Sequence, residues 1–359
     1  MLIYILVVAF PLLIDIWYRK RVAAGVLSVD GTQNRKLRWK FIFLAALPMF
    51  VLIAFRNQSI GADTGVYIYH FNKMITTPWP NIFENSNMDP GYVIFVKLIT
   101  VFTDDPLVYQ VICALIYLLA ITTFTNQQED NHFLILFLYG SLGMYTFMFT
   151  GVRQCLAISV CLFSYRFIKE RKLIPFILLM IIAFYFHNSA ILFAAAYLIY
   201  PRKLSFPNAL MYAIGVILSV IYLDVIQKWF NERFEYDYGI ESGAGGEIFA
   251  VLIICITAFT IYAMVKGNVA SREAKGSTNI GMITAFFWLL RLFTRVAERP
   301  SYYFMLCTFA SFAYAISTLK DYKEKYVVKM LVISFAMLLF IYRLLNNQAN
   351  FIPYSIFTK

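Results

Sequence analysis

Residues 174–200 read IPFILLMIIAFYFHNSAILFAAAYLIY, and the way this stretch folds decides the topology of the chain. Such an uncharged run is typical of membrane helices. One tilted helix would be roughly 40 Å long, and two helices would each be roughly 20 Å long. A single helix would place the basic loops at 266–278 and 319–329 outside, against the tendency of Lys and Arg to stay inside. The sequence therefore favours a hairpin that turns at His187, because the Asn and Ser that follow are good helix N-caps.

The composition of the chain also indicates a membrane protein. Its 359 residues are 61% hydrophobic and 14% charged, with a mean hydropathy of +0.68. Soluble domains are about 45–50% apolar and about 25% charged, so a soluble fold of this length would not bury so much apolar surface. The net charge of +11 does not indicate a nucleic-acid partner, because most of the 31 Lys and Arg residues lie in short loops between apolar runs.

The apolar runs predict an all-α polytopic membrane protein with about 12 transmembrane helices, since about 17–25 helical residues cross the hydrocarbon layer. Positive charges follow the first run, which places the N-terminus outside. One transmembrane domain covers 1–359, with an outer loop or re-entrant region at about 56–105 and a smaller outer loop at about 228–247. The predicted spans are 2–18, 39–55, 106–124, 133–149, 153–168, 173–186, 188–200, 209–227, 248–265, 280–296, 302–318 and 327–344.

In this layout, polar side chains collect at the outer ends of the spans. Arg56 ends the second span, Arg153 opens the fifth, and His187 lies at an outer turn. Arg343 closes the last span on the same side. One arginine at a span end is explained by snorkelling, so Arg343 alone carries little functional meaning.

A further group of charges comes from WLLRLFTRVAERPSYYF (288–304). Arg291, Arg295 and Arg299 are spaced to share one stripe of a helix, with Glu298 beside them and a proline that ends the helix. An arginine near the bilayer centre costs about 2.5–3.5 kcal/mol. Three arginines on one helical stripe, together with two more arginines at the same depth, indicate a bound polyanion such as a phosphate or pyrophosphate. The reason is that the planar guanidinium donates hydrogen bonds that match phosphate oxygens.

Five short motifs, in this order, resemble a known family. They are FRNQSIGADTGVYIY (55–69), DPGYVIFVKL (89–98), GVRQCLAIS (151–159), FHNSAIL (186–192) and ERPSYYF (298–304). Their order and spacing over nearly the whole chain resemble the Wzy/EpsG-type family of O-antigen and exopolysaccharide polymerases. The chain departs from the family pattern at Asp89-Pro90, where many relatives have Glu before the Gly-Tyr pair.

The resemblance implies a membrane glycosyltransferase that uses undecaprenyl-pyrophosphate-linked sugar repeat units. Such an enzyme moves a growing glycan, such as the O-antigen of lipopolysaccharide, from one lipid carrier onto another unit. It implies a fold like that of the membrane C-type glycosyltransferases, in the bacterial inner membrane, with the active site facing the periplasm. The implied partners are the lipid-linked oligosaccharides and membrane lipid, and a chain-length regulator protein is left open. No cofactor is implied.

The chemistry of this transfer suggests roles for the polar residues. The pyrophosphate leaving group gathers negative charge, so fixed cations should face it. We expect Arg153, Arg291, Arg295 and Arg299 to bind it, together with Arg56 where the head group lies. The sequence has no acidic cluster typical of a metal site, so we expect a metal-independent reaction.

The attacking hydroxyl needs a proton acceptor, and His187 and Asp63 are the two candidates. An imidazole with a reference pKa of about 6.5 is mostly neutral at pH 7 and suits this role. A lone His at a turn is also often structural, and Asp63 alternatively caps the next segment or pairs with Arg56. Glu298 is expected to pair with Arg295 or Arg299 and to hold the arginines in place.

Four tyrosines are candidate supporting residues, either stacked on sugar rings or placed at the membrane interface where tyrosine is common. They are Tyr67, Tyr92, Tyr302 and Tyr303.

Two other functions remain open at this point. A ligase that moves finished glycan onto another acceptor uses similar arginines but usually carries a larger outer loop than the stretch at 228–247. A transporter for lipid-linked oligosaccharides should carry charge at midplane depth and should have related halves. The charges here gather at one face, and no such halves are apparent, so the sequence favours the polymerase.

Overall fold

A computed structural model describes residues 1–24, 32–84, 86–202, 246–267, 269, 271–347 and 350–357, with 214–215, 217–218, 221–222, 225 and 228. The predicted span at 209–227 and the predicted outer loop at 228–247 lie largely outside the described residues. Every named element in the described ranges is a helix. In chain order they are α1 (Leu2–Ala23), α2 (Thr32–Ala54), α3 (Thr64–Thr76), η1 (Trp79–Asn81), α4 (Pro90–Thr100), α5 (Pro106–Asn126), α6 (His132–Ser141), α7 (Met144–Phe147), α8 (Val152–Lys169), α9 (Leu173–Phe186), η2 (Asn188–Ala194), α10 (Ala195–Ile199), α13 (Glu247–Lys266), α14 (Arg272–Arg291), η3 (Arg295–Ala297), α15 (Glu298–Thr318) and α16 (Tyr322–Asn346).

Five of the described helices are long and apolar enough to cross a membrane, namely α1, α2 from Arg35 onward, α5, α13 and α16. Shorter apolar helices are α4, α6, α9 and the η2–α10 segment. This supports a polytopic membrane protein, while the count of about 12 spans stays a prediction. The most extensive helix pairs are α14 with α15, α2 with α5, and α8 with α9.

Contacts between helix ends define one end of the bundle. Arg19 of α1 binds Asp15 at 2.7 Å and Asn131 at 3.3 Å. Lys169, at the last residue of α8, donates to the backbone oxygen of Gln127 at 3.3 Å. Asn131 and Gln127 both belong to the connection between α5 and α6, so these contacts lie together. We call this the Asp15 end.

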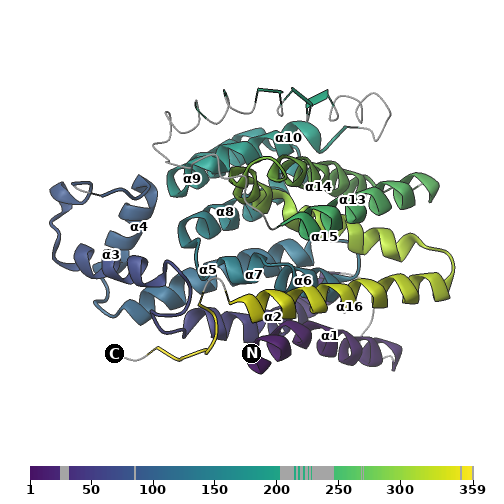
Figure 1. The fold of residues 1–359 in the computed structure, drawn as a ribbon, viewed down its shortest axis with the longest axis horizontal. Coiled ribbons are helices and arrows are strands. Elements are labelled where there is room, and N and C mark those ends of the chain that lie inside the picture. The colour runs from purple at the N-terminus through teal and green to yellow at the C-terminus, as the bar shows by residue number, and fades with distance from the viewer. Residues whose placement is uncertain are drawn as a thin grey trace.

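The other end, which we call the Arg153 end, includes the opposite terminus of α8. Gln154 Nε2, at the start of α8, donates to the backbone oxygen of Arg299 at the start of α15, at 2.7 Å. The hydroxyls of Ser189 and Tyr303 lie 3.1 Å apart. The helices α3 and α4 lie beyond one end of the longer helices (Figure 1). Gln154, Ser189 and the start of α15, which the predicted layout places on the outer side, therefore lie together at this end.

The stretch that decides the topology folds as a hairpin. Helix α9 ends at Phe186, and His187 is extended with φ −164° and ψ 120°. The rings of Phe176 and Tyr197 stack at 5.0 Å, although one continuous helix would separate them by roughly 30 Å. The favoured hairpin is confirmed, and its second arm begins as the 3-10 helix η2 and becomes α-helical only in α10.

The predicted span at 133–149 is broken rather than continuous. Helix α6 ends at Ser141, and Gly143 has φ +95° in the left-handed region, which glycine adopts readily. A Cβ on Gly143 would lie 2.9 Å from Cζ of Arg343, so this guanidinium packs closely against the glycine. A larger residue would not leave room for both the turn and the Arg343 side chain.

The predicted helical stripe of Arg291, Arg295 and Arg299 is wrong. Helix α14 ends at Arg291, and Thr294 is extended, with a side chain that accepts the backbone N–H two residues later. The proline expected to end a helix instead lies in the first turn of α15, where its missing N–H costs little. The three arginines therefore come from a helix end, a 3-10 turn and a helix start.

The region at 56–105 folds into two short helices, α3 and α4, linked through η1. Lys97, which the sequence places inside an apolar run, is 8% exposed. Its Nζ donates to the backbone oxygen of Met74 at 2.9 Å and lies 5.9 Å from the ring of Trp79. These contacts join α4 to α3 and satisfy the buried charge within the pair.

Candidate functional site

Three side chains from separate segments meet at the Arg153 end. Arg153 Nη1 lies 2.5 Å from Asp89 Oδ2, and His187 Nδ1 lies 3.4 Å from the same oxygen. Asp89 and His187 are each 6% exposed, whereas the Arg153 side chain is 21% exposed. A buried carboxylate is costly unless it is paired, so Arg153 stabilises Asp89 where it stands. We call this group the Asp89 cluster.

The local sequence explains how each member of the Asp89 cluster reaches it. Asp89 precedes α4, whose first residue is proline, a residue well suited to that position. A Cβ on Gly91 would lie 2.8 Å from the backbone of Tyr185, so this glycine lets α4 approach α9 closely. Arg153 is in the first turn of α8, and His187 occupies the break after α9.

A second polar group lies at the turn between α14 and α15. Arg291 Nε lies 3.1 Å from Glu298 Oε2, and the Tyr302 hydroxyl donates to Glu298 Oε1 at 2.8 Å. The sequence predicts that Glu298 pairs with Arg295 or Arg299. The pair forms with Arg291 instead, because α14 stops there and the chain turns back into α15 at Glu298.

The two polar groups lie on neighbouring segments. Gln154, next to Arg153, binds the backbone of Arg299, and Ser189, just after His187, contacts Tyr303. Arg295 and Arg299 are exposed, while Arg291 is 5% exposed. Arg153, Arg291, Arg295 and Arg299 therefore belong to segments that meet at the Arg153 end.

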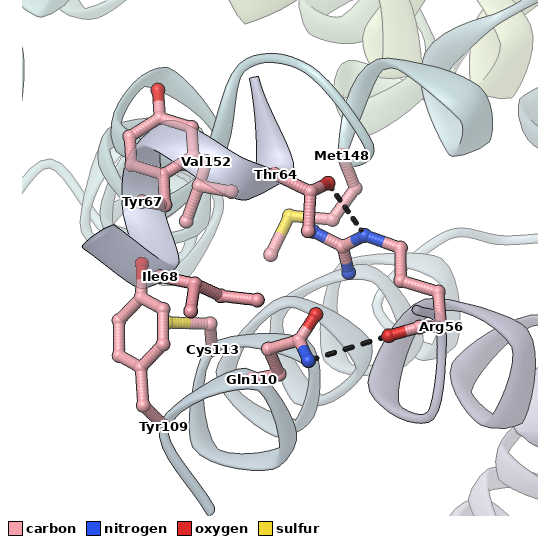
Figure 2. A pocket seen from close by; sticks show the side chains of 9 residues that line it. All are labelled: Arg56, Thr64, Tyr67, Ile68, Tyr109, Gln110, Cys113, Met148 and Val152. Carbon is pink, nitrogen blue, oxygen red and sulfur yellow. Dashed lines mark hydrogen bonds between the residues drawn. The ribbon is translucent and has the colours of Figure 1, made fainter. Parts of the chain in front are cut away.

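Arg56 does not lie at the surface as expected. It is 3% exposed, its Nε donates to Thr64 Oγ1 at 3.0 Å, and its Nη1 donates to the backbone oxygen of Ile53. Figure 2 shows its guanidinium in a small cavity and Gln110 donating to its backbone oxygen at 3.4 Å. Because its donors serve the end of α2 and the start of α3, Arg56 organises the loop and does not present its charge outward.

Asp63 lies just before α3 and is half-buried. Its carboxylate makes no cap hydrogen bond, and it forms no ion pair with Arg56, which binds Thr64 instead. The structure thus gives Asp63 neither of the structural roles that the sequence analysis considered. Its use as a base stays a prediction.

The four candidate tyrosines are buried, with exposures of 6% or less for Tyr67, Tyr92, Tyr302 and Tyr303. The Tyr92 hydroxyl lies 2.7 Å from that of Tyr109, and Tyr92 packs against Tyr67 at a ring distance of 5.7 Å. Tyr92 and Tyr303 are enclosed by neighbouring side chains, which does not favour stacking of their rings on a sugar, and the supporting role of the four tyrosines stays a prediction. Burial raises the pKa of Tyr67, and the nearby Arg153 cation opposes that shift.

Sequence reasoning missed two site residues. Asp89 was noticed only as a departure from a family pattern, although an acid directly before Pro-Gly-Tyr is the signal that identifies it. His70 in α3 gave no signal at all. It is 6% exposed, its ring lies 5.5 Å from that of Tyr92, and neither ring nitrogen has a hydrogen-bond partner among the described residues.

The Asp89 cluster combines an imidazole, a carboxylate and a guanidinium, which together can accept a proton and face an anion. Within the part of the chain that the structure describes, no group of three or more His, Cys, Asp or Glu is placed to hold a metal ion. The metal-independent reaction stays a prediction.

Comparison with known proteins adds one positive finding. The sequence model of the EpsG family matches residues 39–356, which includes every residue of the Asp89 cluster. No curated protein and no solved structure matches the chain.

Proposed function

The chain belongs to the EpsG family, a Wzy/EpsG-type polymerase family, and from this premise we propose that it is a polysaccharide polymerase acting on undecaprenyl-pyrophosphate-linked repeat units. The transfer takes place at the periplasmic face of the bacterial inner membrane. A growing glycan leaves its lipid carrier and joins the sugar end of another lipid-linked unit. The single observation that supports this most directly is the meeting of His187 and Arg153 on one buried carboxylate, at the end of the bundle where Arg295 and Arg299 are exposed.

The proposed reaction is a displacement at the anomeric carbon. An acceptor hydroxyl oxygen forms a bond to that carbon, and the bond from the carbon to the pyrophosphate oxygen breaks. The electron pair of the broken bond stays on the pyrophosphate, and the hydroxyl proton goes to a base on the protein. The protein must therefore supply one proton acceptor and one set of cations.

His187 is the better of the two predicted bases. Asp89 contacts its Nδ1, and a neutral imidazole that donates from Nδ1 carries its lone pair on Nε2, the atom that would accept the hydroxyl proton. The contact of 3.4 Å is long, but such contacts often shorten only when substrate is bound. Among the residues that the structure describes, Asp63 has no comparable partner to orient it.

Arg295 and Arg299 are the proposed ligands of the pyrophosphate, since both are exposed at the Arg153 end. Arg291 is buried against Glu298 and supports the turn that carries them. Arg153 lies between the two roles, because one of its nitrogens is bound to Asp89 and its side chain is still partly exposed. We do not propose Arg56 as a pyrophosphate ligand, because its Nε and Nη1 donate hydrogen bonds to Thr64 and Ile53 inside the protein.

The test is genetic complementation in a host that makes a laddered surface polysaccharide. Deletion of the gene should leave single repeat units, and the wild-type gene should restore the ladder. His187→Ala and Arg295→Ala should fail to restore long chains, because removal of a positioned base alone costs about 10²–10⁴-fold in rate. Arg166→Ala is the matched control, since the Arg166 side chain is 62% exposed and forms a local ion pair with Glu170, four residues later.

The outcomes separate the three candidate functions. Long chains in the deletion strain would rule out a polymerase. Single repeat units attached to the final acceptor would rule out a ligase and a transporter, since both must still be working. Full ladders from His187→Ala would remove His187 from the site even if the polymerase activity stood.

A further inference from the structure

Asp89 holds two different groups with one oxygen. Oδ2 contacts both Arg153 Nη1 and His187 Nδ1. The carboxylate is 4% exposed, so water does not compete freely for it. Its side chain does not cap the helix that it precedes, although Asp is a good capping residue, so its hydrogen-bonding capacity is directed at these two partners.

From this geometry we propose that Asp89 is a positioning residue that fixes the tautomer and orientation of His187, and that it also holds Arg153 in the site. The inference rests on the proposed function only for its catalytic consequence. The contacts among the three residues stand independently of what the substrate is.

The chemistry of the contact determines the tautomer. An ionised carboxylate can only accept hydrogen bonds, so His187 Nδ1 must carry the hydrogen that lies between them. The lone pair of a neutral imidazole is then on Nε2, on the other side of the ring. A carboxylate that orients an imidazole in this way makes the opposite nitrogen available as a base.

Arg153 explains why Asp89 is not itself the base. Its guanidinium makes a charge-assisted hydrogen bond of 2.5 Å with the oxygen that faces His187. A proton transferred to Asp89 would remove the negative charge opposite a partly buried cation, which is costly. The carboxylate is therefore suited to hold its neighbours, and the imidazole is suited to accept the proton.

The cluster also connects the segments that carry it. Asp89 belongs to the start of α4, Arg153 to α8, and His187 to the break between α9 and η2. Because three segments meet at one carboxylate, loss of its charge should release the imidazole without disturbing the Asp15 end of the bundle.

The first experiment reads the tautomer directly and does not depend on activity. The chain has three histidines, so protein labelled with ¹⁵N-histidine gives three sets of ring signals, and replacement of His187 by Gln identifies its own. At pH 8, where a reference imidazole is neutral, we expect the wild-type signal of the Nδ1–H form. Asp89→Asn should shift His187 toward the Nε2–H form, and Asp89→Glu should restore most of the wild-type signal.

Asp15→Asn is the matched control. Asp15 is also a buried acid with two cationic partners, Arg19 and Lys329, but it lies at the other end of the bundle. It should leave the His187 signal unchanged. If Asp89→Ala does not fold, Asp89→Asn still tests the proposal because it keeps the size of the side chain.

The second experiment measures transfer with lipid-linked repeat units extracted from the polymerase deletion strain. Asp89→Asn should lower kcat about 100-fold, in the range for loss of a positioned base, with KM changed less than about threefold because uniform binding is kept. A wild-type His187 in the Nε2–H form, or one that Asp89→Asn leaves unchanged, would overturn the proposal. If the tautomer responds as expected but wild-type protein transfers no glycan, the proposed function fails and the positioning role stands.

Discussion

Arg56 and Arg153 both lie where an apolar helix meets the Arg153 end, and the sequence gives no reason to treat them differently. Their partners in the structure differ completely. Arg56 is 3% exposed and binds a backbone oxygen and a hydroxyl, with the Phe149 ring 5.3 Å from its Cζ. Arg153 binds a carboxylate that also contacts His187.

This difference separates a folding role from a chemical one. The last carbonyls of a helix lack partners and carry partial negative charge, so Arg56 is stabilised by the end of α2 without any acid. Among the described residues it forms no ion pair. The Arg153 charge is instead balanced by Asp89, which places an acid, a base and a cation together. The group that binds an arginine therefore indicates the role of that arginine better than its depth in the membrane does.

The largest expected effect comes from the loop that Arg56 organises. Gly61 has φ +88°, and an added Cβ would meet the backbone oxygen of Phe149 and lie 2.8 Å from its Cβ. Gly61→Ala should lower the free energy of unfolding by about 2–5 kcal/mol, since the left-handed backbone costs about 1–2 kcal/mol and overpacking about 1–3 kcal/mol. Thermal unfolding of the wild type and of Gly61→Ala in detergent measures this loss of stability.

Gly65→Ala is the control for this prediction. Gly65 lies inside α3, and the nearest atom to an added Cβ is the backbone oxygen of Gln58 at 3.7 Å. Alanine is the better helix former, so this variant should be unchanged or slightly more stable. Equal unfolding temperatures for the two variants would mean that the loop is not constrained as described.

The direct comparison of the two arginines uses lysine at each position. Lys keeps the charge but has no planar fork, so Arg56→Lys should lose a hydrogen bond to Thr64 or Ile53 and about 1.5–3 kcal/mol of stability. Arg153→Lys should retain a charge opposite Asp89 and lose less than about 1 kcal/mol, in the range of a partly exposed pair. A strain that carries Arg153→Lys should make a shorter polysaccharide ladder than the strain with the wild-type gene.

Unfolding midpoints and ladders, recorded for both lysine variants at matched expression, check this prediction. A larger loss of stability at Arg153 than at Arg56 would reverse the assignment of folding and chemical roles.

The parts of the fold that the sequence could predict depend on composition. Apolar runs give the helices, whereas the inside and outside assignment of the two ends, which follows from the basic residues, stays a prediction. The hairpin at His187 followed from the same charge argument, and the stacking of Phe176 on Tyr197 confirms it. These inferences succeed because burial of apolar side chains and exclusion of charge act on whole segments.

The parts that the sequence could not predict depend on single residues. Gly143 breaks an apolar run without any change in hydropathy, and Thr294 ends the supposed arginine stripe by capping the next turn. Both effects come from local backbone geometry, which spacing alone does not reveal. For the candidate site, His187 and Arg153 were named in advance, whereas Asp89 was recognised only when the structure brought it against both.

The smallest expected effect compares two histidines. His187 has a carboxylate partner, whereas His70 is buried with no hydrogen-bond partner for its ring among the described residues. Burial is the main cause that lowers the pKa of His70 to about 4, and the positive charges of Lys73 and Arg153 contribute to the same shift. In the unfolded chain its pKa is about 6.5, so below that pH the unfolded state binds the proton first.

Stability should therefore be full above pH 6.5 and should fall as the pH drops toward 4. Between pH 7 and pH 5 the loss assigned to His70 should be about 1–2 kcal/mol, at 1.36 kcal/mol per unit. The difference in unfolding free energy between wild type and His70→Phe, measured at both pH values, isolates this contribution from those of the acids. Phe keeps the ring against Tyr92 and removes the titration, so its profile should be flatter by that amount. Parallel profiles would mean that His70 is already hydrated or paired in the folded protein. The presence or absence of a hydrogen-bond partner would then no longer distinguish His70 from His187.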